Sequence, residues 1–195
     1  MTRLRLTALA AALAGTALTG GCVAIDASDM HVDNDHGRAP VGAMTEATLR
    51  SASGAVVGKA TFNQGTTGLL IRIDAQNMTL GWHGIHLHAV GSCEPSAFTS
   101  AGAHVNHGDP KASHGLLNAD GPDDGDLPNI WAGSDGRVHA ELFTTRGRLS
   151  SEGPGQYLLD ADGSALVVHA NTDDHTTQPI GGAGDRVACG VLATG

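Results

Sequence analysis

The feature that most constrains the fold is the succession of short apolar runs and turn residues that occupies the chain from Thr45 onward. Runs rich in Val, Leu, Ile and Thr, such as residues 55–62 and 68–73, alternate with segments rich in Gly, Asn and Asp. Such runs are typical of β-strands, and no long amphipathic helix interrupts them. The 28 glycines suit the turns and close loops of an antiparallel sandwich. About 150 residues in one such pattern suffice for a single domain with its own core.

One run carries two histidines, His86 and His88, separated by one residue. Side chains alternate between the two faces of a strand, so both imidazoles point to one face, while Ile85 and Leu87 point to the other, into a core. Imidazole is a preferred ligand of copper and zinc, so two rings on a strand form half of a metal site. Taken alone, the pair is weak evidence for a metal, because two exposed polar residues on a half-buried strand give the same pattern.

More residues of metal-ligand type follow in a stretch rich in Gly, Asp, Pro and Asn, and the apolar run 165–168 ends in His169. The chain resembles the copper/zinc superoxide dismutases, particularly bacterial secreted forms, across residues 44–192, because several blocks occur in the family's order. These blocks are HGIHLH (83–88), GSCEP (91–95), HVN (104–106), HGL (114–116), GDLPN (125–129), VVH (167–169) and GAGDRVACG (182–190).

The resemblance implies an all-β fold: a Greek-key antiparallel β-sandwich or barrel, immunoglobulin-like, with long metal-binding loops. It also implies an enzyme whose histidine-bound copper disproportionates superoxide to dioxygen and hydrogen peroxide. A noncatalytic copper-binding protein on the same fold is the alternative, and the intact copper ligands and Arg186 argue against it. A purely structural sandwich would not require ligands from three separated segments.

The resemblance assigns each copper-side residue a role. The expected copper ligands are His86, His88, His104 and His169. His104 is also expected to bridge to zinc through its second ring nitrogen and to carry one of the protons that the reaction consumes. Arg186 is expected to lie beside copper and attract the anion with an unremovable positive charge.

The zinc half departs from the family pattern at one position. His104, His114 and Asp126 match zinc ligands, but Asp123 stands where the family has its third zinc histidine. A carboxylate is an acceptable zinc ligand, so we expect Asp123 to complete the site. The alternative is a weakened or empty site, as in copper-only relatives. His107 is a possible substitute ligand, although a solvent-facing loop histidine is the simpler interpretation.

Asp173 matches the family's carboxylate that links a copper histidine to a zinc histidine, here His86 and His114. His83 matches a position that hydrogen-bonds backbone instead of metal. His139 and His175 carry no assigned role.

The N-terminal residues are typical of an export signal. Residues 1–21 begin with two arginines and continue as an Ala/Leu/Thr/Gly stretch too short to span a bilayer, which predicts a cleaved signal peptide. Small residues before Cys22 favour lipidation of that thiol, with an ordinary signal peptide cut nearby as the alternative. Residues 22–43 are polar and aperiodic, which predicts a flexible tether before a dismutase domain at 44–195. The predicted protein is therefore exported to the periplasm or cell envelope, where a lipidated Cys22 would anchor it to a membrane.

Three cysteines are present: Cys22, Cys93 and Cys189. A lipidated Cys22 would leave one pair without an odd thiol, and export favours a disulfide over two buried free thiols. The resemblance pairs the same two positions, Cys93 with Cys189.

The net charge of the chain limits which partners it can bind. The formal net charge is −9, and cleavage of residues 1–21, which contain two arginines and no acidic residue, makes it −11. Nonspecific binding of nucleic acid is therefore not expected. Superoxide is an anion, so local charge matters more, and Lys111 lies in the expected metal-binding loop. Trp82 and Trp131 suit either an interface or a cap on the sandwich, and the sequence leaves monomer and dimer open.

Overall fold

The computed structural model describes residues 42–192. The predicted signal peptide, Cys22 and the tether up to residue 41 lie outside the described residues. Within residues 42–192, no helix has the length and hydropathy needed to cross a lipid bilayer.

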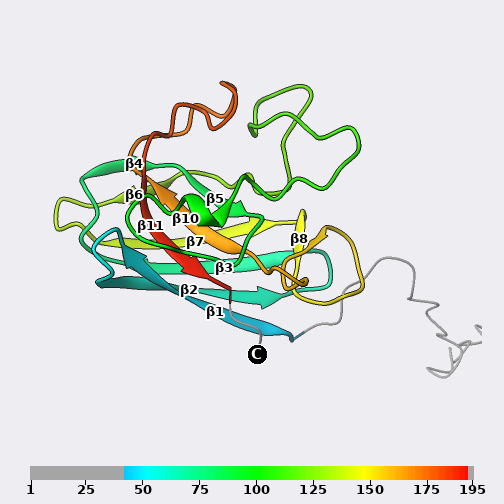
Figure 1. The fold of residues 1–195 in the computed structure, drawn as a ribbon, viewed down its shortest axis with the longest axis horizontal. Coiled ribbons are helices and arrows are strands. Elements are labelled where there is room, and N and C mark those ends of the chain that lie inside the picture. Colours follow the sequence, from blue (N-terminus) through cyan, green and yellow to red (C-terminus); the bar gives the residue numbers. More distant parts are fainter. Residues whose placement is uncertain (1–41, 193–195) are drawn as a thin grey trace, which may run out of the picture. The chain divides into compact units, whose positions relative to one another are not determined.

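Seven of the strands form one curled antiparallel sheet (Figure 1). Its last strand in the sequence, β11, returns to pair with the first, β1, a long-range return typical of Greek-key folds. The predicted all-β antiparallel class is thereby confirmed. In sheet order the strands are β5 (Ile85–His88), β10 (Ala165–His169), β11 (Arg186–Val191), β1 (Met44–Ser51), β2 (Val56–Gln64), β3 (Leu69–Ala75) and β7 (Val138–Thr144).

Two small ladders and one helical turn complete the described structure. β4 (Gly81–His83) pairs with β6 (Ile130–Ala132), and β8 (Gly147–Arg148) pairs with β9 (Gln156–Tyr157). A short 3₁₀ helix, η2, spans Thr99–Ala101.

The core lies on one face of the sheet because alternate residues of its strands are apolar. In β3, Leu69, Ile71, Ile73 and Ala75 are buried, while Arg72 and Asp74 are exposed. This period of two is what a half-buried antiparallel strand requires. Buried side chains of β1, β2, β5, β7 and β10 join the same hydrophobic cluster.

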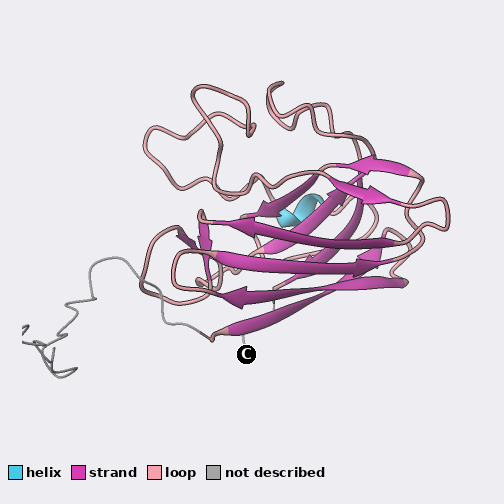
Figure 2. Ribbon diagram, turned by 180° about the vertical axis from the view of Figure 1, so that it is seen from behind, coloured by secondary structure: helices cyan, strands magenta, loops and turns pink. Residues whose placement is uncertain are grey.

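β5 and β10 differ from the other strands because every residue in them is buried. Ile85 and Leu87 of β5 belong to the main core, as the alternation predicted, so His86 and His88 lie on the opposite face. That face is covered by two loops, residues 89–129 and 170–185, which Figure 2 shows as long segments beyond the strands. The histidines are therefore enclosed between a rigid sheet and these loops.

The backbone of Leu87 fixes where the longer loop crosses β5. Its N–H donates to the Gly125 carbonyl and its carbonyl accepts from the Val105 N–H, each at 2.9 Å. Residue 125 must be glycine, since a Cβ there would lie 2.3 Å from the Leu87 carbonyl oxygen. These bonds place the adjacent residues His104 and Asp126 directly beside the strand.

The loop is also fastened to β11, on the same face of the sheet. Cys93 and Cys189 form a disulfide with a Cα–Cα distance of 5.7 Å, which confirms the predicted pairing. This bond joins the segment before η2 to β11, the strand that begins with Arg186. Phe98 and Ala101 pack with Cys189 in a second small core beneath the loop.

Candidate metal centre

Four buried imidazoles gather on the loop-covered face of the sheet. His86 and His88 come from β5, His169 ends β10, and His104 comes from the loop that lies back on β5. Each ring offers a ligand atom, and these atoms all lie within 4.8 Å of one another. The structure therefore brings together all four residues that the resemblance predicted as copper ligands.

One nitrogen of each ring is buried without a hydrogen-bond partner. The atoms are Nδ1 of His86 and Nε2 of His88, His104 and His169. Buried polar atoms in native proteins are almost always satisfied, so four unsatisfied nitrogens around one point fit a metal that prefers imidazole. The residues present thus fit copper.

The opposite nitrogens of three rings are fixed by hydrogen bonds. His88 Nδ1–H donates to the Gly102 carbonyl (2.9 Å), and His169 Nδ1–H donates to the Gly184 carbonyl (3.0 Å). His86 Nε2–H donates to Asp173 Oδ2 (2.8 Å). These bonds set each tautomer so that the unpartnered nitrogen keeps its lone pair.

Burial keeps these rings neutral at pH 7. Loss of hydration lowers the pKa of His86 to about 3 and that of His169 to about 4. It also lowers the pKa of His88 to about 2. A neutral imidazole is the form that binds a metal ion.

A second cluster adjoins the first and consists of His104, His114, Asp123 and Asp126, all buried. His104 Nδ1 lies 3.0 Å from Asp123 Oδ2 and 3.6 Å from Asp126 Oδ1. His114 Nδ1 lies 2.5 Å from Asp126 Oδ1, and neither atom has a hydrogen-bond partner. Two imidazoles and two carboxylates in this arrangement fit the donor set of a zinc ion.

The carboxylates dominate the electrostatics of this second cluster. Although burial opposes the charged form, the neighbouring carboxylates of Asp126 and Asp173 raise the pKa of His114 to about 10. The pKa of Asp126 lies well below its usual range, because His104 and His114 outweigh the effect of burial. The cluster therefore attracts positive charge strongly.

The backbone presets both carboxylates of the second cluster. Asp123 Oδ1 accepts the Gly125 N–H (2.9 Å), which leaves Oδ2 facing His104. Asp126 Oδ2 accepts the N–H groups of Asp123 (2.9 Å) and Gly115 (2.7 Å), which leaves Oδ1 facing the histidines. His107, the possible substitute, is exposed and lies outside the metal-type clusters of the described residues.

His104 belongs to both clusters. Its Nε2 is among the unpartnered nitrogens of the first, and its Nδ1 faces the carboxylates of the second. Its ring centroid is 4.1 Å from that of His86 and 5.2 Å from that of His114. One imidazole thus connects the two sites, as the resemblance predicted.

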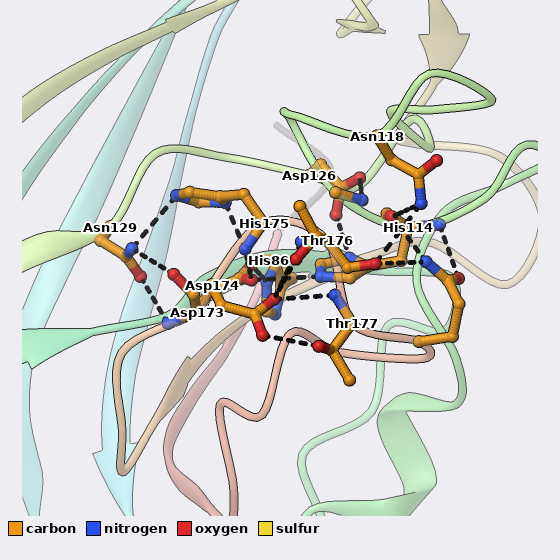
Figure 3. Close-up of polar contacts among 12 residues, drawn as sticks. His86, His114, Asn118, Asp126, Asn129, Asp173, Asp174, His175, Thr176 and Thr177 are labelled. Carbon is orange, nitrogen blue, oxygen red and sulfur yellow. Dashed lines mark hydrogen bonds and ion pairs between the residues drawn. The ribbon is translucent and has the colours of Figure 1, made fainter.

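Asp173 connects them a second time, from behind the rings (Figure 3). Its Oδ2 accepts from His86 and its Oδ1 accepts from His114 Nε2 (3.2 Å). The carboxylate is buried, and its pKa lies far below the usual range because the donors facing it outweigh burial. His83 instead donates from Nδ1 to the His169 carbonyl (2.7 Å) and so holds backbone.

Arg186 lies at the edge of a cavity of about 390 Å³ that His88 and His104 also line. Two backbone carbonyls fix its guanidinium: one N–H donates to Phe98 (2.6 Å) and another to Gly102 (2.7 Å). Lys111 lines the same cavity, in agreement with the prediction that it lies near the site. A small anion entering the cavity therefore meets positive charge in the same space that the imidazoles line.

The sequence did not reveal two residues that hold the backbone of His114 and Asp173 in place. Gln178 clamps the backbone of His114, accepting its N–H (3.0 Å) and donating to its carbonyl (2.8 Å). Asn129 does the same for Asp173, at 2.9 and 2.8 Å. Asn129 ends the GDLPN block, but neither residue carries a local signal for this role, because a loop amide with such a partner looks like any other polar loop residue.

Comparison with known proteins agrees with this geometry. Residues 56–192 match the family described as copper/zinc superoxide dismutase. The Cu-Zn superoxide dismutase of Caulobacter vibrioides is 49% identical over 146 residues, covering 75% of this chain and 83% of the relative. Cu-Zn superoxide dismutase 1 of Aquifex aeolicus is 38% identical over 149 residues, covering 76% and 86%.

Solved structures are similar as well. The crystal structure of a SOD-like protein from Bacillus subtilis has a TM-score of 0.71 and 35% sequence identity, and the match covers 76% of this chain and 97% of that one. The Cu/Zn superoxide dismutase from Brucella abortus has a TM-score of 0.62 at 26% identity, covering 77% and 100%.

Proposed function

This chain belongs to the copper/zinc superoxide dismutase family, and we propose that it works as an exported enzyme that protects the cell envelope. Its activity is superoxide dismutation, in which two superoxide anions and two protons give one dioxygen and one hydrogen peroxide. The observation that carries this function is the convergence of four unpartnered imidazole nitrogens beside the cavity that Arg186, His88 and His104 line.

Copper supplies the alternating one-electron oxidation and reduction of this reaction when it is bound, and zinc supplies a fixed positive charge. We assign His86, His88, His104 and His169 to copper, and His104, His114, Asp123 and Asp126 to zinc. The unpartnered atoms of these residues support the assignment. Asp173 is assigned to hold the Nε2–H tautomers of His86 and His114, which keeps their Nδ1 atoms free.

Two side chains act on the substrate in this proposal. Arg186 attracts superoxide and orients it with N–H donors, since two backbone carbonyls already prevent its guanidinium from swinging away. In the state in which His104 Nε2 does not bind copper, this atom can hold a proton and pass it to the reduced oxygen species. Asp123 and Asp126 keep Nδ1 of the same ring in place meanwhile.

Metal content decides between this function and the alternative. The mature chain is loaded with copper and zinc, and metal stoichiometry and superoxide dismutation are measured on the same samples. One copper and one zinc with high activity would support both assignments. One copper, little zinc and retained activity would make the enzyme copper-only. Bound copper without turnover would leave the noncatalytic copper-binding protein.

Export and anchoring form the second part of the proposal. The signal-like residues 1–21 and the small residues before Cys22 support a lipid-anchored enzyme of the periplasm or cell envelope. In cell fractionation, we expect the wild-type protein in the membrane fraction and a Cys22→Ser variant in a soluble extracytoplasmic fraction. Wild-type protein that is soluble after export would contradict the anchor, and protein that stays in the cytoplasm would contradict export.

A further inference from the structure

His175 is a histidine near the metal sites to which the sequence gives no role. It lies in the loop that follows β10, its side chain is 17% exposed, and its backbone N–H donates to Asp173 Oδ1 at 2.6 Å (Figure 3). Its φ is +61°, in the left-handed region that few residues other than glycine adopt. A histidine held in this conformation against a buried carboxylate calls for an explanation.

The hydrogen bonds of Asn129 fix the tautomer of His175. Because the Asp173 N–H needs an acceptor, Asn129 Oδ1 must be the atom that faces it, at 2.9 Å. Asn129 Nδ2 then donates to the Asp173 carbonyl (2.8 Å) and to His175 Nε2 (3.1 Å). A ring nitrogen that accepts carries no hydrogen, so the proton of the neutral ring is on Nδ1.

That Nδ1–H faces the same carboxylate. His175 Nδ1 lies 3.4 Å from Asp173 Oδ2 and has no hydrogen-bond partner in the described structure. The distance is too long for a strong hydrogen bond. The N–H dipole still stabilises the buried negative charge, because little water reaches Asp173. Ring and backbone of His175 thus act on the carboxylate that also accepts from His86 and His114.

The carbonyl of His175 fastens the loop that carries His114. It accepts the Leu117 N–H (3.1 Å), and Gly115 packs so closely that a Cβ there would lie 2.1 Å from the same oxygen. One residue therefore contacts Asp173, Asn129 and the loop beside His114. Displacement of the ring would loosen the carboxylate on which both metal sites depend.

We propose that His175 is a positioning residue that, together with Asn129, holds the Asp173 carboxylate against His86 and His114. Through Asp173 it keeps hydrogen on Nε2 of both rings and leaves both Nδ1 atoms, which are unpartnered, for metal. This inference rests on the metal assignment of the proposed function. It predicts that removal of the ring weakens metal binding without any change in a ligand.

The test is His175→Gly in the mature chain. Glycine adopts φ +61° without strain and keeps the N–H to Asp173 and the carbonyl to Leu117, so the ring alone is lost. We expect the zinc dissociation constant, measured by competition with a chromophoric chelator, to rise about 10-fold. We also expect the electron paramagnetic resonance spectrum of bound Cu(II) to change, because the His86 ring is less firmly oriented.

His139→Ala is the matched control, since His139 is a 64% exposed histidine on β7. This variant should have the zinc dissociation constant and the Cu(II) spectrum of the wild type. The thermal midpoint of the metal-free protein separates positioning from general stability, and it should be similar in the wild type and the glycine variant. If the glycine variant does not fold, His175→Asn, which also tolerates positive φ, is measured in the same way.

Unchanged zinc affinity and an unchanged Cu(II) spectrum in the glycine variant, or in the asparagine variant if it replaces it, would overturn the inference. So would a parallel loss of stability in the metal-free variant that accounts for the whole effect. Wild-type protein that binds neither metal would instead contradict the proposed function.

Discussion

Asp123 divides its two carboxylate oxygens between the backbone and the bridging histidine. Oδ1 is engaged by the Gly125 N–H, and Oδ2 lies 3.0 Å from His104 Nδ1. With Asp126 it makes the second cluster more negative than one with three imidazoles and one carboxylate would be. Aspartate in place of the family's third zinc histidine therefore keeps a ligand atom in place and changes the charge of the site.

At this residue scale, Asp123→Ala should weaken zinc binding more than any change outside the ligand set. A zinc site with three protein ligands left should bind about 100-fold more weakly, since loss of a mere supporting contact already costs 10-fold or more. Competition titration with a chelator measures the effect. Asp120→Ala, an exposed carboxylate in the same loop, is the control. Equal zinc affinity in both variants would show that Asp123 is not a ligand.

At the scale of elements, β5 positions the site both through its own side chains and through the backbone of Leu87. The strand period predicted the faces of His86 and His88 correctly, because alternation is a local property. The position of His104 and Asp126 beside β5 depends on hydrogen bonds to residues distant in the sequence. No local pattern contains them, so the resemblance alone indicated that these residues meet.

The crossing of the long loop over β5 should not tolerate a side chain at residue 125. In Gly125→Ala, the new Cβ would push against the Leu87 carbonyl and displace His104 and Asp126. We expect the free energy of unfolding to fall by about 2 kcal/mol and zinc to be retained poorly. Gly65→Ala, where the nearest atom is 3.3 Å from the new Cβ, should change both little. Denaturant titration and metal analysis provide the two readings, and a fully zinc-loaded, stable Gly125→Ala variant would contradict this view.

The disulfide joins the other end of that loop to β11. Replacement of Cys93 and Cys189 by serine removes a cross-link between residues 96 positions apart. By the chain-entropy relation, the free energy of unfolding should fall by about 4 kcal/mol. Dismutation should fall too, since Arg186 is held by the Phe98 and Gly102 carbonyls of the cross-linked loop. Guanidinium unfolding and rates measured on fully metal-loaded protein test both effects, and unchanged rates would show that the loop holds Arg186 without the cross-link.

At the scale of the whole molecule, a chain with a formal net charge of −9 must admit an anion. Lys111 and Arg186 place positive charge at the cavity, whereas Lys59, the other lysine, lies on the outer face of β2 beside Glu46. Distribution of charge, and not its sum, governs encounter with a small substrate. The sequence indicated Lys111 only by its place in the loop, and the structure adds that it lines the cavity.

Lys111→Glu should therefore lower the second-order rate with superoxide about threefold at low ionic strength and much less near 0.5 M salt, where the Debye length is about 4 Å. Lys59→Glu carries the same charge change away from the cavity and should have a smaller effect at every salt concentration. Pulse radiolysis across a salt series gives these rates. A loss of equal size at low and high salt would rule out steering by Lys111.

The Gly102 carbonyl accepts hydrogen bonds from both His88 Nδ1 and Arg186. The guanidinium that attracts the substrate and a ring assigned to copper are therefore held by hydrogen bonds to the same oxygen atom. His88 belongs to β5 and Arg186 to β11, so a single loop carbonyl connects two strands of the sheet at the site. Displacement of that one carbonyl would therefore disturb metal ligation and anion capture together.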